Sequence, residues 1–261
     1  MRALNIASTG MLAQQTNVEV ISNNIANMNT TAYNRRRAEF TDLLYQNARR
    51  VGSNSSDNNT IVPSGVQIGL GVKTNGVYRI SEQGSLTSTS NSLDLAIQGK
   101  GYFQIQLPSG ETAYSRDGAF QLSAAGQVVT SDGYTVLPGI TVPTNATSIS
   151  VNSSGQVSVK LDGQTAQSVV GQLQLSTFAN EAGLEARGNN LFMETAASGT
   201  PTVANAGSTG FGTLQQGYLE SSNVNVVTEI SDMISAQRAY EMNSKVIQSA
   251  DQMMSTVTQM H

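Results

Sequence analysis

Residues 4–28, LNIASTGMLAQQTNVEVISNNIANM, repeat apolar side chains with a period of seven. The repeat has two series three residues apart: Leu4, Met11, Val18 and Ile25, and Ala7, Gln14, Ile21 and Met28. This spacing places both series along one stripe of a helix, as in the seam of a coiled coil. An amphipathic helix packed on its own domain would show the same spacing. The opposite face favours a helix that is covered in an assembly, because it is polar but uncharged at Gln15, Thr16, Asn17 and Asn23.

A second heptad pattern runs from about Asn223 toward residue 261. Its clearest series alternates steps of four and three residues: Val246, Ala250, Met253 and Val257. Ser, Thr, Asn and Asp cap helix starts well, so we expect a cap from Ser221, Ser222 or Asn223. Both ends of the chain are therefore predicted to be long helices.

The two predicted helical ends carry opposite charge. Residues 1–50 hold six basic and three acidic side chains, whereas residues 219–261 hold two basic and five acidic ones. The ends are therefore suited to pair with each other or with other copies of the chain. We expect the assembly interface to contain the following residues: Leu4, Ala7, Met11, Val18, Ile21, Ile25, Met28, Ile230, Ile234, Tyr240, Val246, Ile247, Ala250, Met253, Met254 and Val257.

Between the two ends the apolar period changes to two. Apolar residues alternate in the segments 93–97, 103–107, 149–151, 157–161 and 173–175. Turn dipeptides stand between them: Ser109-Gly110, Asp117-Gly118, Ala125-Gly126, Asp132-Gly133, Ser154-Gly155 and Asp162-Gly163. Tight hairpin turns need positive φ, which Gly adopts without a steric penalty. The pattern predicts an α+β fold: terminal helices forming a coiled-coil domain, and a mainly antiparallel β middle domain.

The composition of the 261-residue chain argues against an enzyme. The net charge of −4 gives no general attraction to nucleic acid. No cysteine is present, and His261 is the only histidine, so thiolate or histidine metal sites and a Ser-His-Asp triad are not expected. No apolar run is long enough for a transmembrane helix, and the first residues do not read as a secretory signal. We predict no catalytic, cofactor-binding or metal-binding residues, no cofactor and no small-molecule substrate.

Several motifs in order along the chain resemble those of bacterial flagellar basal-body rod and hook proteins. They are SNNIANMNTTAY at 22–33, QGKGYF at 98–103, YSRDGAF at 114–120, QGYLESSNVN at 216–225 and QRAYE at 237–241. Within this family, the segment FTDLLYQ at 40–46 and the loop at 63–65 are most similar to the distal rod protein. The resemblance covers nearly the whole chain.

The resemblance implies a structural subunit that polymerises into a helical tube, transmits torque from motor to hook and serves as an export channel. It implies as partners other copies of the chain, other rod proteins, the hook protein, the surrounding ring proteins and the flagellar type III export apparatus. The expected location is the basal body, across the periplasm and outer envelope, after export without a cleaved signal peptide. The implied division is a helical coiled-coil domain (1–32 plus 223–261), a connecting segment with an extended loop (33–75 plus 205–222) and a β-rich outer domain (76–204).

Alternatives to a distal rod subunit stay open at this point. The chain could be a proximal rod subunit, a self-contained β-domain binding module, or an enzyme with catalytic carboxylates, although nothing in the sequence singles out two acids. The polar residues 52–60 read as a flexible loop. Ala32 stands where the family motif usually has Gly, and Ala adopts positive φ poorly. We therefore expect the chain near Ala32 to depart from the turn that a glycine would allow.

Overall fold

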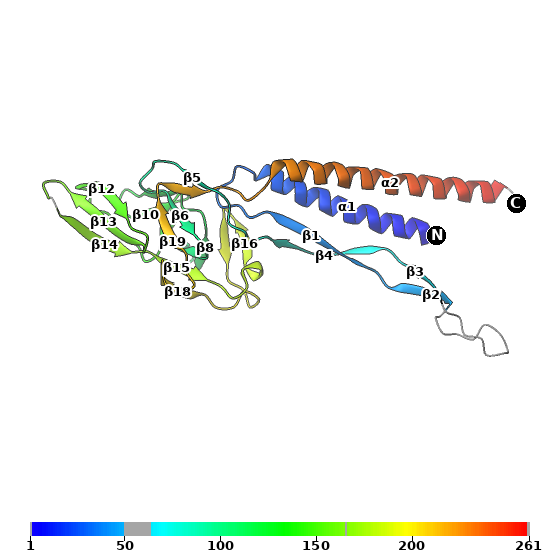
Figure 1. Cartoon of the computed structure of the whole chain (residues 1–261), viewed down its shortest axis with the longest axis horizontal. Helices are drawn as coiled ribbons and strands as arrows, with labels where there is room; N and C mark the ends of the chain where they lie inside the picture. Colours follow the sequence, from blue (N-terminus) through cyan, green and yellow to red (C-terminus); the bar gives the residue numbers. More distant parts are fainter. Residues whose placement is uncertain (1, 50–63, 165, 260–261) are drawn as a thin grey trace. The chain divides into compact units, whose positions relative to one another are not determined.

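The computed structural model describes residues 2–49, 64–164 and 166–259. Helix α1 spans Arg2–Ala26 and helix α2 spans Val226–Gln259. Between them the described residues form strands and one short 3-10 helix, η1 (Glu181–Gly183) (Figure 1). Every strand pairing is antiparallel. The predicted α+β class with an antiparallel middle is therefore confirmed. The predicted 52–60 loop lies outside the described residues.

The strands follow in chain order: β1 (Arg36–Asp42), β2 (Tyr45–Arg49), β3 (Val66–Gly69), β4 (Val72–Arg79), β5 (Leu86–Ser88), β6 (Leu95–Gln98), β7 (Tyr102–Gln106), β8 (Thr112–Ser115), β9 (Phe120–Leu122), β10 (Val128–Thr130), β11 (Thr135–Val136), β12 (Ala146–Val151), β13 (Gln156–Leu161), β14 (Gln167–Gln172), β15 (Gln174–Thr177), β16 (Glu185–Gly188), β17 (Leu191–Met193), β18 (Thr202–Asn205), β19 (Thr213–Gln216) and β20 (Tyr218–Glu220). The largest sheet has the order β16-β17-β8-β7-β11-β10-β9, and β15 joins it by pairing with β7 and β18. Smaller sheets pair β12-β13-β14, β19 with β6, β20 with β5, β1 with β4 and β2 with β3.

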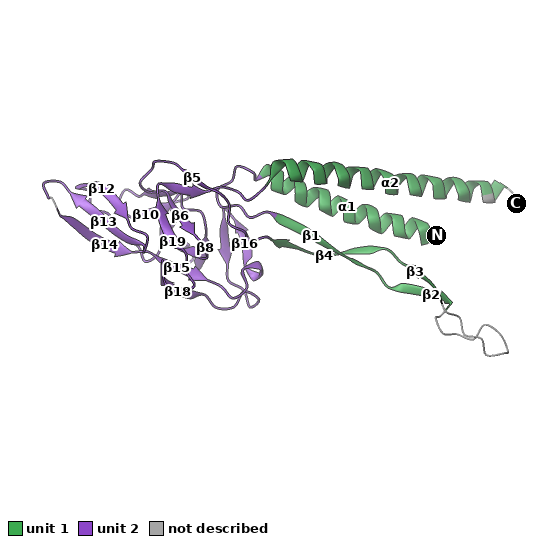
Figure 2. Cartoon of the chain, viewed as in Figure 1, with its two compact units in different colours: residues 1–26, 36–79, 225–261 green, residues 27–35, 80–224 purple. Residues whose placement is uncertain are grey.

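The chain divides into two compact units (Figure 2). The helical unit comprises residues 1–26, 36–79 and 225–261, and the β unit comprises residues 27–35 and 80–224. The predicted division was into three domains, with residues 33–75 and 205–222 as a separate connecting segment, and the structure differs from it. The difference has a physical reason: β1 and β4 pack along α1, while β19 and β20 pair with β6 and β5 inside the β unit.

Within the helical unit α1 and α2 lie side by side and antiparallel, with both chain ends at the same end of the pair (Figure 1). The β1–β4 ribbon contacts α1. Gly71 makes one of these approaches possible, since a Cβ at its φ of +123° would lie 2.2 Å from the hydroxyl of Thr9. The same hydroxyl accepts a hydrogen bond from the backbone N–H of Val72 at 3.4 Å. Helix α1 is therefore covered by α2 and by the ribbon.

Both helices have ends that differ from the predicted ones. α1 stops at Ala26, and a turn follows in which the N–H of Thr30 donates to the carbonyl of Asn27 at 3.2 Å. At the other end, the Oδ1 of Asn225 accepts from the N–H groups of Val227 and Thr228 at 3.1 and 3.3 Å. The cap of α2 is thus Asn225, and the expected caps at 221–223 are wrong. Asn223 lies two residues too early and binds elsewhere, as described below.

Ala32 makes the turn that the sequence led us not to expect. Its φ is +54°, its side chain is 5% exposed, and its N–H donates to the carbonyl of Glu220 at 2.8 Å. Beside it, the Nδ2 of Asn190 donates to the carbonyl of Thr31 at 3.2 Å. These contacts hold residues 27–35 in the β unit and outweigh the steric cost of a left-handed alanine, which is about 1–2 kcal/mol.

The core of the β unit is apolar and closed. Phe103 and Phe120, 0% and 1% exposed, meet edge to face with ring centroids 5.0 Å apart. Five of the six predicted turn glycines have positive φ and join paired strands: Gly110, Gly126, Gly133, Gly155 and Gly163. Gly118 is the exception, because β8 and β9 do not pair with each other. A Cβ on Gly118 would lie 1.6 Å from the carbonyl oxygen of Leu95, so Gly is needed there for close packing.

Candidate assembly interface

The predicted interface residues fall into three groups in the structure. Buried in the helical unit are Ala7, Ile21 and Ala250. Half-buried are Leu4, Met11, Val18, Ile25 and Ile247. Exposed are Ile230, Ile234, Tyr240, Val246, Met253 and Met254. Met28 lies beyond the end of α1, in the β unit, and is 40% exposed, so it does not continue the α1 stripe. Val257 belongs to α2, but its side chain lies outside the described residues.

The inner contact between the two helices includes small and polar residues, and the apolar heptads indicated only Ala250 among those on α2. Ala236 and Ala250 of α2 are 3% and 7% exposed, and Asn243 lies halfway between them in sequence. Opposite it is Gly10 of α1, where an added Cβ would be 2.9 Å from the Nδ2 of Asn243. Small residues let the helix backbones approach closely. The seven-residue spacing of Ala236, Asn243 and Ala250 is the sequence signal that would have located this seam.

A buried hydrogen-bonded group fixes the register of this helix pair. Asn24 is 1% exposed, and its Nδ2 donates to the Oε2 of Glu229 at 3.1 Å and to the carbonyl of Arg36 at 2.8 Å. Its Oδ1 accepts from the N–H of Arg36, also at 2.8 Å. One side chain of α1 therefore binds α2 and the first residue of β1 together. Buried polar side chains of this kind specify register, since any slip would leave them without partners.

Helix α2 exposes a large apolar surface on the side that α1 leaves uncovered. Val227, Met242 and Met253 are 80%, 62% and 63% exposed. Ile230, Ile234 and Val246 are each exposed by just under half. We call these six residues the α2 apolar face. Soluble monomers rarely expose contiguous apolar surface of this kind, and where it occurs it marks an interaction site.

Next to this face, α1 and α2 enclose a groove of about 360 Å³. It is lined by Gln15, Val18 and Glu19 of α1 and by Gln237, Tyr240 and Glu241 of α2. Val18 and the 44%-exposed Tyr240 give the groove an apolar part, while Glu19 and Glu241 give it negative charge. The α2 apolar face and this groove are the surfaces of the helical unit that are suited to binding a partner.

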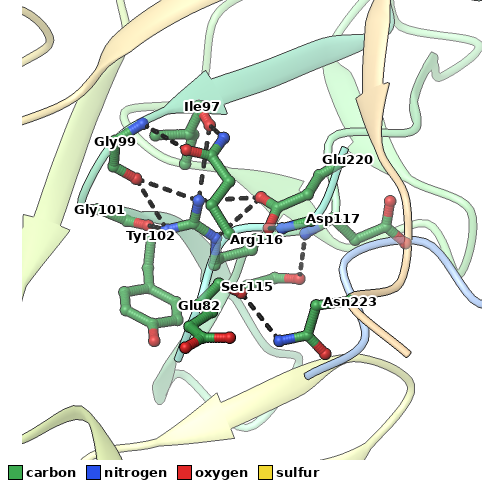
Figure 3. Close-up of polar contacts among 12 residues, drawn as sticks. Glu82, Ile97, Gly99, Gly101, Tyr102, Ser115, Arg116, Asp117, Glu220 and Asn223 are labelled. Atoms are coloured by element: carbon green, nitrogen blue, oxygen red, sulfur yellow. Dashed lines mark hydrogen bonds and ion pairs between the residues drawn. The ribbon is translucent and has the colours of Figure 1, made fainter. Parts of the chain in front are cut away.

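The β unit is held closed by a buried ion pair (Figure 3). The Nη2 of Arg116 lies 2.9 Å from the Oε2 of Glu220, and both side chains are almost completely buried. The guanidinium also donates to the carbonyls of Ile97, Gly99 and Gly101 at 3.1–3.5 Å. The other carboxylate oxygen of Glu220 accepts from the N–H of Gly84 at 3.0 Å. The pair thus joins β20, near the carboxyl end of the unit, to β6 and β7.

Asn223 closes the β unit beside this ion pair. Its Oδ1 accepts from the N–H of Arg35 at 2.7 Å, and its Nδ2 donates to the carbonyls of Ile80 and Glu82 at 3.0 and 2.9 Å. An aromatic cluster packs nearby, in which the rings of Tyr102 and Phe178 meet edge to face with their centroids 5.9 Å apart. In the same cluster, burial and the neighbouring Glu194 carboxylate raise the pKa of Tyr114 above its ordinary value. These residues position the segments of the β unit that lead to both helices.

Within the described ranges, no three His, Asp or Glu side chains are grouped so that they could hold a metal ion. No helix there combines the length and apolar character needed to cross a membrane.

Comparison with known proteins places the chain in a family. The family model described as "Flagella basal body rod protein" matches residues 4–33, "Flagellar hook protein FlgE/F/G D1 domain" matches residues 96–159, and "Flagellar basal body rod FlgEFG protein C-terminal" matches residues 215–260. These segments contain the α1 stripe, the β-unit strands from β7 to β12 and the whole of the described α2.

Full-length relatives agree with these family models. The flagellar basal-body rod protein FlgG of Caulobacter vibrioides is 62% identical over 100% of this chain and 99% of its own length. FlgG of Agrobacterium fabrum is 55% identical over 99% and 98%. FlgG of Bacillus subtilis is 41% identical over 97% of both chains. The chain therefore belongs to the flagellar basal-body rod protein family, and it is a structural rod subunit rather than an enzyme.

Proposed function

We propose that this chain is the subunit of the distal rod, and that its copies polymerise into a helical tube through the helical unit. The observation that carries the proposal is the α2 apolar face, which nothing in the described chain covers. If burial removes the exposed surface of these side chains from water, each gains on the order of 1 kcal/mol. In a tube each copy contributes one such surface, and the same contact is repeated along the axis.

The tube requires contacts of a particular symmetry. A face on α2 that binds a different surface of the next copy makes a head-to-tail contact, and such contacts build open helical filaments when the rotation does not close a ring. We propose that α1 and α2 of neighbouring copies pack as a coiled-coil layer around the axis. Axial helices that contact several neighbours would make the tube stiff enough to transmit torque from motor to hook, and its lumen would serve as the export channel.

The relatives' rod function supports a set of partners and a location. We propose that the tube contacts other rod proteins at one end and the hook protein at the other, inside the ring proteins of the basal body. The subunit would reach this site, across the periplasm and outer envelope, through the flagellar type III export apparatus. The β unit, closed around its own core, would form the outer part of the tube.

Electron microscopy of purified basal bodies tests the proposal. A strain lacking the gene should give basal bodies whose rod stops short and carries no hook. A complete rod and hook in that strain would show that the subunit belongs elsewhere. Complementation then tests the interface: Ile234→Asp, on the α2 apolar face, should leave the rod short and abolish motility. Leu122→Asp is the matched control, because Leu122 is similarly exposed but lies in the β unit; it should restore motility.

A further inference from the structure

Charge is divided unevenly inside the helical unit. The described residues of the ribbon, 36–49 and 64–79, carry five basic side chains and two acidic ones. Helix α2 carries four acidic side chains, Glu229, Asp232, Glu241 and Asp251, and two basic ones. Among the described residues, the ion pairs of the chain do not join the ribbon to α2. Arg79 of the ribbon has an interaction of its own. Glu229 is buried, so the exposed acidic side chains of α2 are Asp232, Glu241 and Asp251. Apart from Arg79, the basic side chains of the described ribbon and these acidic side chains form no ion pair with each other within one copy.

One of these acidic side chains, Glu241, lines the α1–α2 groove. Glu19 and Glu241 come from different helices and line the same groove as Val18 and Tyr240. In the described part of the chain Glu19 accepts a hydrogen bond from Gln15 at 3.1 Å, and Glu241 has no ionic partner. A groove with two carboxylates beside an aromatic ring is suited to a group that is cationic, flat and partly apolar. A guanidinium has these properties, since it binds carboxylates through a planar fork and stacks on aromatic faces.

The ribbon presents such a group. Arg37 and Tyr78 are directly opposite each other in the β1–β4 register, so their side chains share one face of the ribbon. The guanidinium carbon of Arg37 lies 5.8 Å from the centre of the Tyr78 ring. Arg37 is exposed and has no carboxylate partner among the described residues. Stacking on the ring orders the arginine before any partner arrives, which lowers the entropy cost of binding.

We propose that the α1–α2 groove of one copy binds the Arg37–Tyr78 pair of a second copy. The guanidinium would lie between the carboxylates of Glu19 and Glu241, and the Tyr78 ring would cover Val18 and Tyr240. Arg and Tyr are, with Trp, the residue types enriched among the anchors of protein interfaces. The inference rests on the proposed function, because it names the contact that joins neighbouring subunits of the tube. It also makes that contact dependent on salt concentration.

Cysteine cross-linking tests which surfaces meet. The chain has no cysteine of its own, so each introduced thiol is unique. Glu39→Cys marks the ribbon face of Arg37, two residues along β1, and Gln237→Cys marks the groove. The two single variants are co-expressed in one strain, so that any cross-link between the two positions must join different copies. Oxidation of purified basal bodies should give a dimer of twice the 27.5 kDa subunit mass, and each variant expressed alone should not.

A matched pair provides the control for cross-linking. Asp162→Cys, exposed on the β unit, replaces Glu39→Cys and should give no dimer with Gln237→Cys. Absence of the 39–237 dimer in rods that look complete by electron microscopy would overturn the inference and leave the proposed function intact. A cross-linked product of another mass would also overturn it, because the groove would then bind a different protein.

Charge reversal gives an independent test that does not need thiols. Arg37→Glu and Glu241→Arg should each reduce the diameter of a motility halo by more than half, and the double variant should recover most of it. Asp162→Arg should have no effect. Motile single variants, or a double variant no better than either single one, would overturn the inference. The proposed function is judged separately by Ile234→Asp, which alters no charge pair of this contact.

Discussion

The β unit and helix α2 treat their large apolar side chains differently. In the β unit, Ile97, Phe103 and Leu175 have no exposed surface, and they belong to one continuous core. On α2, Val227, Met242 and Met253 each expose more than 60% of their surface. Both segments have apolar residues at regular spacing in the sequence, yet in one segment that spacing builds the interior and in the other it builds a surface.

Polar groups show the same contrast. Arg116 is buried in the β unit and meets Glu220 and three backbone carbonyls. Glu241 on α2 is exposed and has no ionic partner among the described residues. The β unit pairs its buried Arg116 within its own fold and needs no other molecule at that position. A helix that leaves apolar and acidic side chains without partners is complete only in an assembly, which agrees with a rod subunit.

The largest effect is expected where the β unit depends on its buried ion pair. Glu220→Gln leaves the shape almost unchanged but strands the Arg116 charge in the interior. Breaking a buried pair in this way costs about 3–5 kcal/mol in the free energy of unfolding. Urea unfolding followed by the near-ultraviolet circular dichroism of the tyrosines measures this loss.

The exposed pair of the same unit is the control for that experiment. Arg187 and Glu111 lie 3.2 Å apart with more than half of each side chain exposed. Arg187→Met should therefore change stability by less than about 1 kcal/mol. Equal losses in the two variants would mean that burial adds nothing to the Arg116–Glu220 pair, and the β unit would then not depend on a buried charge pair.

A smaller effect is expected at the seam inside the helix pair. Ala236→Leu adds volume where α2 meets α1 closely, and overpacking of this kind costs about 1–3 kcal/mol. Ser235→Leu, one residue away and exposed, should change stability by less than about 0.5 kcal/mol. Thermal melting of the helices, followed by far-ultraviolet circular dichroism, compares the two. If Ser235→Leu were the more damaging variant, the seam assigned to Ala236 would be on the wrong face.

Sequence patterns predicted the element types well but not which helix face is inside. The period of seven and the glycine dipeptides are local signals, and they located both helices and five of the six turns. The heptads of large residues could not separate a packed stripe from an exposed one, because both are apolar at the same spacing. Ile234 is 48% exposed, whereas Ala236 is 3% exposed. The predicted heptads included the small residues Ala7 and Ala250, which are buried, but not Ala236.

Long-range polar contacts were missed for a different reason. Arg116 and Glu220 are separated by 104 residues, and Asn24 and Glu229 by 205. Neither partner carries a local mark that predicts the other. The motifs around them were noticed only as a resemblance to a family. The structure supplies their physical role, which is to close the β unit and to fix the register of the helices.

The smallest predicted effect concerns the turn at Ala32, which belongs to the closed β unit but keeps a strained backbone. Ala32→Gly removes a left-handed strain of about 1–2 kcal/mol, loses a buried methyl worth about 0.8 kcal/mol and loosens the unfolded chain by about 0.4–1 kcal/mol. These terms nearly cancel, so we expect the free energy of unfolding to change by less than about 0.5 kcal/mol.

Ala113→Gly is the matched control, because Ala113 is 0% exposed in β8 without positive φ. Because Ala113 has no backbone strain to release, Ala113→Gly should lower the free energy of unfolding by about 1–2 kcal/mol. Equal losses at both positions would show that the backbone at Ala32 carries no strain. The hydrogen bond from Ala32 to the carbonyl of Glu220 would then have no steric cost to offset.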